Sequence, residues 1–117
     1  MAFQNLSENI ILVDLAGEPQ MRDELKTITD MVADRRDCDV IIDFSGVDIV
    51  TSSSLSSLLR LRQLLVDCGH RLVFCGVAPF TRSTFSVTGL DGIFELAEDR
   101  TAAAAVLQCA GQPGNTQ

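Results

Sequence analysis

The feature that most constrains the fold is a regular alternation between short β-branched apolar runs and longer stretches with helical periodicity. The apolar runs lie at residues 10–15, 40–44, 71–76 and 93–96. Their length and composition are typical of strands. Between them, apolar residues recur every three or four positions, as on one face of a helix. Strands that alternate with helices favour a mainly parallel sheet flanked by helices.

Helices are expected over residues 19–36, 52–67, 80–87 and 101–110. The core-facing residues of the first two are Met21, Leu25, Ile28 and Val32, and Leu55, Leu58, Leu61 and Leu65. Residues 2–6 favour an edge strand in an opening hairpin. The predicted fold is therefore α/β, with a mixed, mainly parallel sheet of four to five strands, an antiparallel N-terminal edge strand and about four flanking helices.

The chain has 117 residues and a net charge of −7. This length favours one domain, expected over residues 1–110 and followed by a polar, disordered tail over 111–117. The acidic balance argues against nucleic-acid binding, which needs clustered Lys and Arg. The sequence has no apolar run of about 18 residues, as a membrane span needs, and no secretory signal. A cytoplasmic protein without direct membrane insertion is expected.

The cysteines do not form a metal or disulfide pattern. They lie at positions 38, 68, 75 and 109, and no two are spaced as C-x-x-C. Cys68 and His70 are neighbours, but no second ligand pair lies at zinc spacing. Without an export signal a disulfide framework is not expected. Buried or half-buried thiols, no metal and no cofactor are therefore predicted.

Four hydroxyl residues, Thr51 to Ser54, precede the second helix. They follow a strand of an α/β sheet, at the edge where sites usually lie. They also lie at a helix N-terminus, which offers free N–H groups and a positive dipole end. A helix cap is the simplest interpretation, because a Ser or Thr hydroxyl accepts from a first-turn N–H. One hydroxyl is enough for a cap, so the others leave room for a further role.

Catalytic interpretations of the cluster are disfavoured. A nucleophilic serine needs a base within hydrogen-bond reach. The single histidine, His70, follows the far end of the same helix, roughly 27 Å from Ser52 at 1.5 Å per residue. The chain has no G-x-S-x-G elbow and no phosphate-binding G-x-x-x-x-G-K-[ST] loop.

A modification site is the remaining interpretation. A phosphoserine adds about −1.5 to −2 charges and three acceptor oxygens. A helix N-terminus tolerates this charge, whereas a partner docked over the junction meets a charged, hydrated group. The chemistry alone leaves open which of Thr51, Ser52 and Ser53 is the acceptor.

Several short segments are specific as an ordered set, although each is weak alone. They are Leu15-Ala16-Gly17-Glu18, VIIDFSGVDIV at 40–50, Thr51-Ser52-Ser53-Ser54-Leu55, Gly69 to Gly76, Ala78-Pro79, and Thr88-Gly89-Leu90 closing on Phe94. Together, over roughly residues 8 to 110, they resemble the STAS domains, and within them the small single-domain anti-sigma factor antagonists.

The resemblance implies a protein-interaction module and no enzyme. In that family the antagonist binds a kinase-like anti-sigma factor and thereby frees a sigma factor for transcription. The anti-sigma factor uses its own bound ATP to phosphorylate the antagonist, which breaks the complex, and a phosphatase restores it. By the resemblance, the phosphoacceptor corresponds to Ser52.

The resemblance also implies a partner-binding face. It joins the 17–20 loop, the 50–54 junction and the exposed first turns of the second helix. Its residues are Gly17, Glu18, Gln20, Thr51, Ser53, Ser54, Ser56 and Arg60. Three of them depart from the family pattern, since Thr51 and Gln20 each stand where the family has Asp, and Ser54 where it has Gly. These changes remove carboxylates from the face and add a side chain where a partner approaches closely.

Three alternatives remain open within or near the same fold. The first is a non-phosphorylated STAS subunit of an ABC-type lipid transporter. The second is a stressosome-like scaffold component, which predicts very large assemblies. The third is a small-ligand binder at the helix N-terminus, which predicts a bound anion there.

Overall fold

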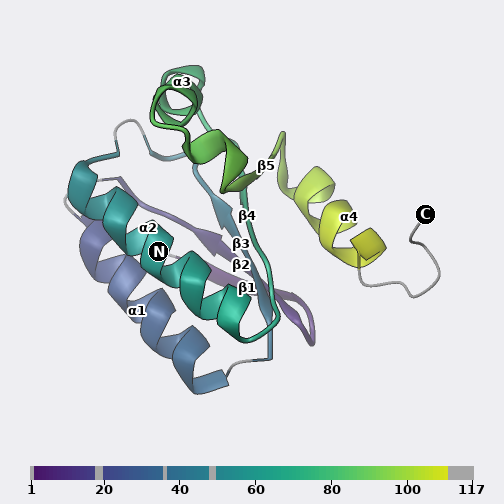
Figure 1. Ribbon diagram of the computed structural model, residues 1–117. Coiled ribbons are helices and arrows are strands. Elements are labelled where there is room, and N and C mark those ends of the chain that lie inside the picture. The colour runs from purple at the N-terminus through teal and green to yellow at the C-terminus, as the bar shows by residue number, and fades with distance from the viewer. Residues whose placement is uncertain (1, 18–19, 36, 48–49, 111–117) are drawn as a thin grey trace.

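The chain forms one five-stranded sheet with helices on both faces (Figure 1). The computed structural model describes residues 2–17, 20–35, 37–47 and 50–110. The strands lie in the sheet in chain order: β1 (Ala2–Ser7), β2 (Ile10–Asp14), β3 (Asp39–Asp43), β4 (Leu72–Cys75) and β5 (Glu95–Ala97). β1 pairs antiparallel with β2, and every later pairing is parallel. The predicted fold class is confirmed.

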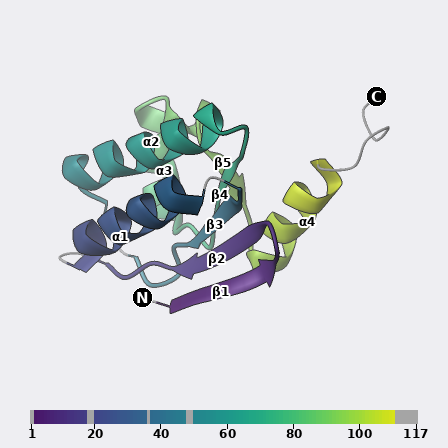
Figure 2. The same cartoon turned by 90° about the horizontal axis from the view of Figure 1, so that it is seen from below.

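Three helices cover one face of the sheet and the last helix covers the other (Figures 1 and 2). The first three are α1 (Gln20–Arg35), α2 (Ser52–Asp67) and α3 (Pro79–Val87), and the last is α4 (Arg100–Ala110). A short 3-10 helix, η1 (Leu90–Gly92), follows α3. Right-handed crossovers between parallel strands place α1 and α2 next to each other.

Each face of the sheet contributes side chains to its own apolar core, because successive strand residues point to opposite faces. Ile11 and Val13 pack under α1 and α2, whereas Ile10 and Leu12 pack on the side of α4. Strands that are buried on both faces have continuous apolar sequences rather than alternating ones. The apolar runs in this sequence therefore indicated a parallel sheet covered on both sides. The aromatic centre of the larger core is a set of four stacked or tilted rings: Phe44, Phe74, Phe85 and Phe94.

The helical faces agree with the periodicity. All four predicted core residues of α1 are buried. In α2, Leu58, Leu61 and Leu65 are buried and Leu55 is half-buried. α2 ends at Asp67, and Gly69 follows with φ of +79°, the left-handed geometry expected of a helix stop. The predictions that concern Glu18, Pro19, Arg36 and the 111–117 tail lie outside the described residues.

The last strand is later than predicted. We expected it over residues 93–96, but β5 begins at Glu95. The backbone N–H groups of Ile93 and Phe94 both donate to the carbonyl of Leu90, so the chain is still turning out of η1 at these positions. The apolar character of Phe94 reflects packing rather than strand pairing, since Phe94 is buried among the core rings, whereas Ile93 is exposed.

The described thiols are free, as predicted. Cys38 and Cys75 are buried and Cys68 is half-buried. Burial raises the pKa of Cys75 to about 11, so this thiol stays protonated and unreactive near neutral pH. The side chain of Cys109 lies outside the described residues. Within the described ranges no helix combines the length and apolarity that a membrane span requires.

Candidate functional site

Thr51 caps the start of α2. Its backbone is extended, and its Oγ1 accepts a hydrogen bond from the backbone N–H of Ser54 at 3.2 Å. The same hydroxyl donates to Ser54 Oγ, also at 3.2 Å. One of the free N–H groups of the first turn is thereby satisfied. The capping interpretation is confirmed for Thr51.

The three serines that follow are not equivalent. Ser54 is only 2 % exposed, so it does not lie on the exposed partner face that the sequence suggested. The reason is helical geometry: position 54 lies four and seven residues before Leu58 and Leu61, on the side that faces the core. Ser52 and Ser53 are exposed, and no described group hydrogen-bonds to either side-chain hydroxyl.

The two loops predicted to form the partner face are neighbours. A Cβ added at Gly17 would lie 3.5 Å from the carbonyl oxygen of Gly46, and one added at Gly46 would lie 3.5 Å from that of Leu15. The β2–α1 loop therefore contacts the connection that leads from β3 toward Thr51. Gln20 is exposed at the first residue of α1.

Ser53, Ser56 and Arg60 line a groove between α1 and α2. The two helices lie side by side (Figures 1 and 2), and the groove has a volume of about 650 Å³. From α1 it is lined by Arg22 and Lys26, among others. The sequence suggested Ser53, Ser56 and Arg60 as contact residues, and the structure adds the two cations that face them.

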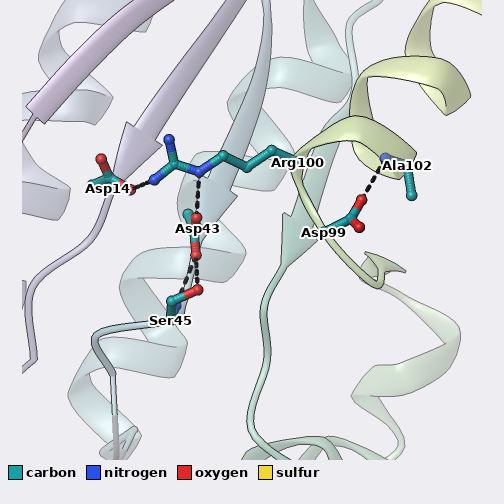
Figure 3. Close-up of polar contacts among 6 residues, drawn as sticks. All are labelled: Asp14, Asp43, Ser45, Asp99, Arg100 and Ala102. Carbon is teal, nitrogen blue, oxygen red and sulfur yellow. Dashed lines mark hydrogen bonds and ion pairs between the residues drawn. The ribbon is translucent and has the colours of Figure 1, made fainter.

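A second polar cluster, at the carboxyl ends of β2 and β3, was not predicted (Figure 3). Arg100, the first residue of α4, donates from Nε to Asp43 Oδ2 at 2.6 Å and forms an ion pair with Asp14. Asp43 Oδ1 accepts from the backbone N–H of Ser45 at 2.8 Å and from its hydroxyl at 2.5 Å. We call Asp14, Asp43, Ser45 and Arg100 the arginine clamp.

The arginine clamp keeps Asp43 ionised although its carboxyl group is buried. Burial alone would raise the pKa of Asp43, but the hydrogen bonds from Ser45 and Arg100 outweigh it and lower that pKa. The hydrogen bond to Asp43 in turn raises the pKa of Arg100. The clamp ties α4 to the sheet, and through Ser45 it holds the start of the connection that leads to Thr51.

The geometry does not provide an activated nucleophile. His70 lies beyond the C-terminal end of α2, where its Nδ1 is 3.1 Å from Asp39 Oδ1. Among the described residues no base contacts the hydroxyl of Ser52 or Ser53, and no cluster of metal-ligating side chains is present. What the junction offers is an exposed hydroxyl pair on a capped helix end, next to a basic groove.

Sequence reasoning missed the arginine clamp for a specific reason. Asp14 and Asp43 end adjacent parallel strands, so their proximity follows from the predicted sheet. Arg100 is 57 residues from Asp43, and no local pattern connects them. Arg22 and Lys26 were not among the predicted site residues, because the side of α2 that they face is decided by the packing of the two helices.

Comparisons with known proteins agree on the family. The family model described as the STAS domain matches residues 10–103. A Bordetella bronchiseptica protein, BtrV, described as a candidate anti-sigma factor antagonist, is 31% identical over 99 residues, covering 85% of this chain and 82% of that protein.

Two solved structures illustrate the likeness in fold. A candidate anti-sigma factor antagonist from Thermotoga maritima has a TM-score of 0.80 at 13% identity, covering 92% of this chain and 93% of that one. The Bacillus cell fate determinant SpoIIAA in its phosphorylated form has a TM-score of 0.68 at 15% identity, covering 90% and 97%. At such identities the likeness concerns the fold alone.

Proposed function

The chain belongs to the STAS domain family, and we propose that it acts there as an anti-sigma factor antagonist. In this proposal it binds a kinase-like anti-sigma factor and so releases a sigma factor for transcription. Two observations support the proposal. The chain is 31% identical in sequence to BtrV over most of both chains. Its ordered segments also resemble those of the single-domain antagonists. The protein itself is a cytoplasmic binding module, without catalysis or a cofactor of its own.

The binding switch is assigned to Ser52. The assignment rests on the family resemblance, and the different positions of the four hydroxyls support it. The hydroxyls of Thr51 and Ser54 are engaged in the cap. Ser53 lines the groove, and Ser52 is exposed at the first residue of α2. Ser52 and Ser53 are therefore the hydroxyls that a kinase can reach without breaking the cap, and the family resemblance selects Ser52. The phosphorylated SpoIIAA structure supports a phosphorylated state in a protein of this fold.

The physical effect of phosphorylation falls on the interface rather than on the fold. A phosphoryl group of about −1.5 to −2 charges at the N-terminus of α2 lies at the positive end of the helix dipole, so the domain accommodates it. A partner that covers the same turn would have to desolvate the phosphoryl group, and this cost weakens the complex. The partner's own ATP supplies the phosphoryl group, and a phosphatase removes it and restores binding.

The proposal is tested by isolating the tagged protein from its own cells, with and without stress. Intact mass and peptide mapping identify the modification, and co-purifying proteins are identified on the same sample. We expect one phosphoryl group on Ser52 and an inverse relation between this modification and a bound kinase-like ATPase. Ser52→Ala should retain the partner under all conditions, whereas Ser53→Ala, which removes the neighbouring hydroxyl, should still carry the phosphoryl group on Ser52.

Two results would overturn the proposal. One is the absence of phosphate in every condition together with co-purifying transporter subunits. The other is a very large assembly on size exclusion without a kinase-like ATPase, which favours a scaffold role.

A further inference from the structure

The groove between α1 and α2 is basic, although the protein as a whole carries a net charge of −7. Three cationic side chains line it, Arg22 and Lys26 from α1 and Arg60 from α2, against one carboxylate, that of Asp30. Four hydroxyls complete the polar lining, those of Thr29 from α1 and of the serines at positions 53, 56 and 57 from α2. The groove thus combines positive charge with hydrogen-bonding groups along two exposed helix flanks.

Among the described residues these cations have no partner, whereas most of the other cations have one. Arg35, Arg71 and Arg100 form ion pairs with nearby carboxylates. Arg62 donates to a backbone carbonyl. Over the part of the chain that the structure describes, Arg22, Lys26, Arg60 and Arg82 have no ion-pair or hydrogen-bond partner. Three of these four side chains line the same groove.

This arrangement gives the folded domain little. Arg22 and Lys26 are four residues apart on α1, so these like charges repel one another across one helical turn, and Asp30, four residues after Lys26, offsets only part of the positive charge. Unpaired exposed cations attract anionic groups of other molecules. Because the rest of the protein is acidic, this attraction is confined to the groove.

We propose that the α1–α2 groove binds an acidic segment of the protein partner that docks over the Ser52 junction. This inference rests on the proposed function and names the chemistry of its partner. Charge complementarity defines the occupant, and continuity places it, because Ser53 lines the groove directly beside Ser52. The groove extends the contact from the junction along the exposed flanks of both helices.

The groove also explains why phosphorylation acts as a release signal. A phosphoryl group on Ser52 stands at the groove end where Ser53 lies, and its charge has the same sign as that of the acidic segment. Repulsion then opposes docking, and the groove cations gain an anion from the protein's own chain. Both effects weaken the complex without any change in the fold.

The first test uses a synthetic ten-residue polyglutamate peptide and the ¹⁵N-labelled full chain at low salt. We expect amide shifts confined to residues 22–30 and 53–60, and weaker binding as salt is added. The variant R22Q/K26Q/R60Q should bind at least about ten-fold more weakly. The matched control is R82Q, which removes an exposed, unpartnered cation on α3 and should bind as the wild type does. The spectrum itself shows whether each variant is folded.

Three results would overturn the assignment. Shifts scattered over the surface, or equal affinity in the triple variant, would remove the groove as the site. Saturation by inorganic phosphate at the same concentration would make it a small-anion site. Tighter binding of a single-stranded oligonucleotide than of the peptide would assign it to nucleic acid.

The second test compares partner retention by the wild type, R22Q/K26Q/R60Q and R82Q in pull-downs from the protein's own cells. Loss of the kinase-like ATPase only in the triple variant supports the groove. Equal retention by all three overturns the groove assignment and leaves the proposed function intact. If none retains such an ATPase, the proposed function fails, and the peptide titration still decides on the groove.

Discussion

Two polar clusters lie near the carboxyl ends of the central strands, and they use their polar groups in opposite ways. In the arginine clamp, Asp43 accepts three hydrogen bonds, from Ser45 and from Arg100. At the α2 junction, Thr51 caps the helix, and the hydroxyls of Ser52 and Ser53 are exposed. A buried polar group must be hydrogen-bonded, so the clamp is bound to the fold. An exposed hydroxyl with water as its partner is available to another protein.

The difference predicts where substitutions damage folding and where they damage binding. Changes in the arginine clamp should lower the free energy of unfolding. They should weaken partner binding only where the domain unfolds. Changes at Ser52 should leave stability nearly unchanged. The following predictions test this contrast.

The largest effect is expected at Gly76, next to the clamp. Gly76 has φ of +65°, and a Cβ there would lie 2.5 Å from Ser45 Oγ and 2.8 Å from Asp43 Oδ1. Left-handed strain and overpacking together predict that Gly76→Ala costs about 3 kcal/mol, measured by urea unfolding. Gly69→Ala is the matched control, since Gly69 has φ of +79° but open space around its Cβ position. Its expected cost is about 1 kcal/mol from strain alone, and equal losses at both sites would contradict a crowded clamp.

The next effect is expected at Asp43. Asp43→Asn keeps the size of the side chain but removes the charge that Arg100 contacts, so the expected loss of stability is about 2 kcal/mol at neutral pH. Since the pKa of Asp43 is lowered in the folded protein, its ionised form contributes stability above the unfolded pKa. That contribution is lost as pH falls through the folded pKa.

The pH dependence gives this prediction a second readout. The stability difference between the wild type and Asp43→Asn should be constant above about pH 5 and shrink as the pH falls below about 4. Urea unfolding at a series of pH values measures it. A difference that stays constant down to pH 2 would show that Asp43 is not held ionised by the clamp.

The smallest effects separate the hydroxyls of the junction. Thr51→Ala removes the cap of α2 and should cost about 1 kcal/mol. Ser52→Ala removes an exposed hydroxyl without a described partner and should change stability by less than about 0.5 kcal/mol. Thermal or urea unfolding measures both. The reverse order would mean that Ser52 belongs to the fold and is a poor switch.

The sequence by itself determined the elements and their class. Apolar periodicity within α1 and α2, the short β-branched runs and the turn glycines act over a few residues, so a linear pattern contains them. The ordered segments around Gly17 and Ser52 also placed the junction and the family. The start of the last strand was missed, because the backbone N–H groups of Ile93 and Phe94 donate to the carbonyl of Leu90 instead of pairing in the sheet.

Only the tertiary structure decided which polar groups are free. Ser54 is the exception, because its spacing from Leu58 and Leu61 already placed it on the core-facing side of α2. The arginine clamp joins residues 57 positions apart, and the basic groove exists only because α1 and α2 pack side by side. Such contacts depend on the packing of distant segments, and no pattern of neighbouring residues specifies them. The sequence therefore identified the hydroxyls, and the structure separated the capping Thr51 from the exposed Ser52 and Ser53.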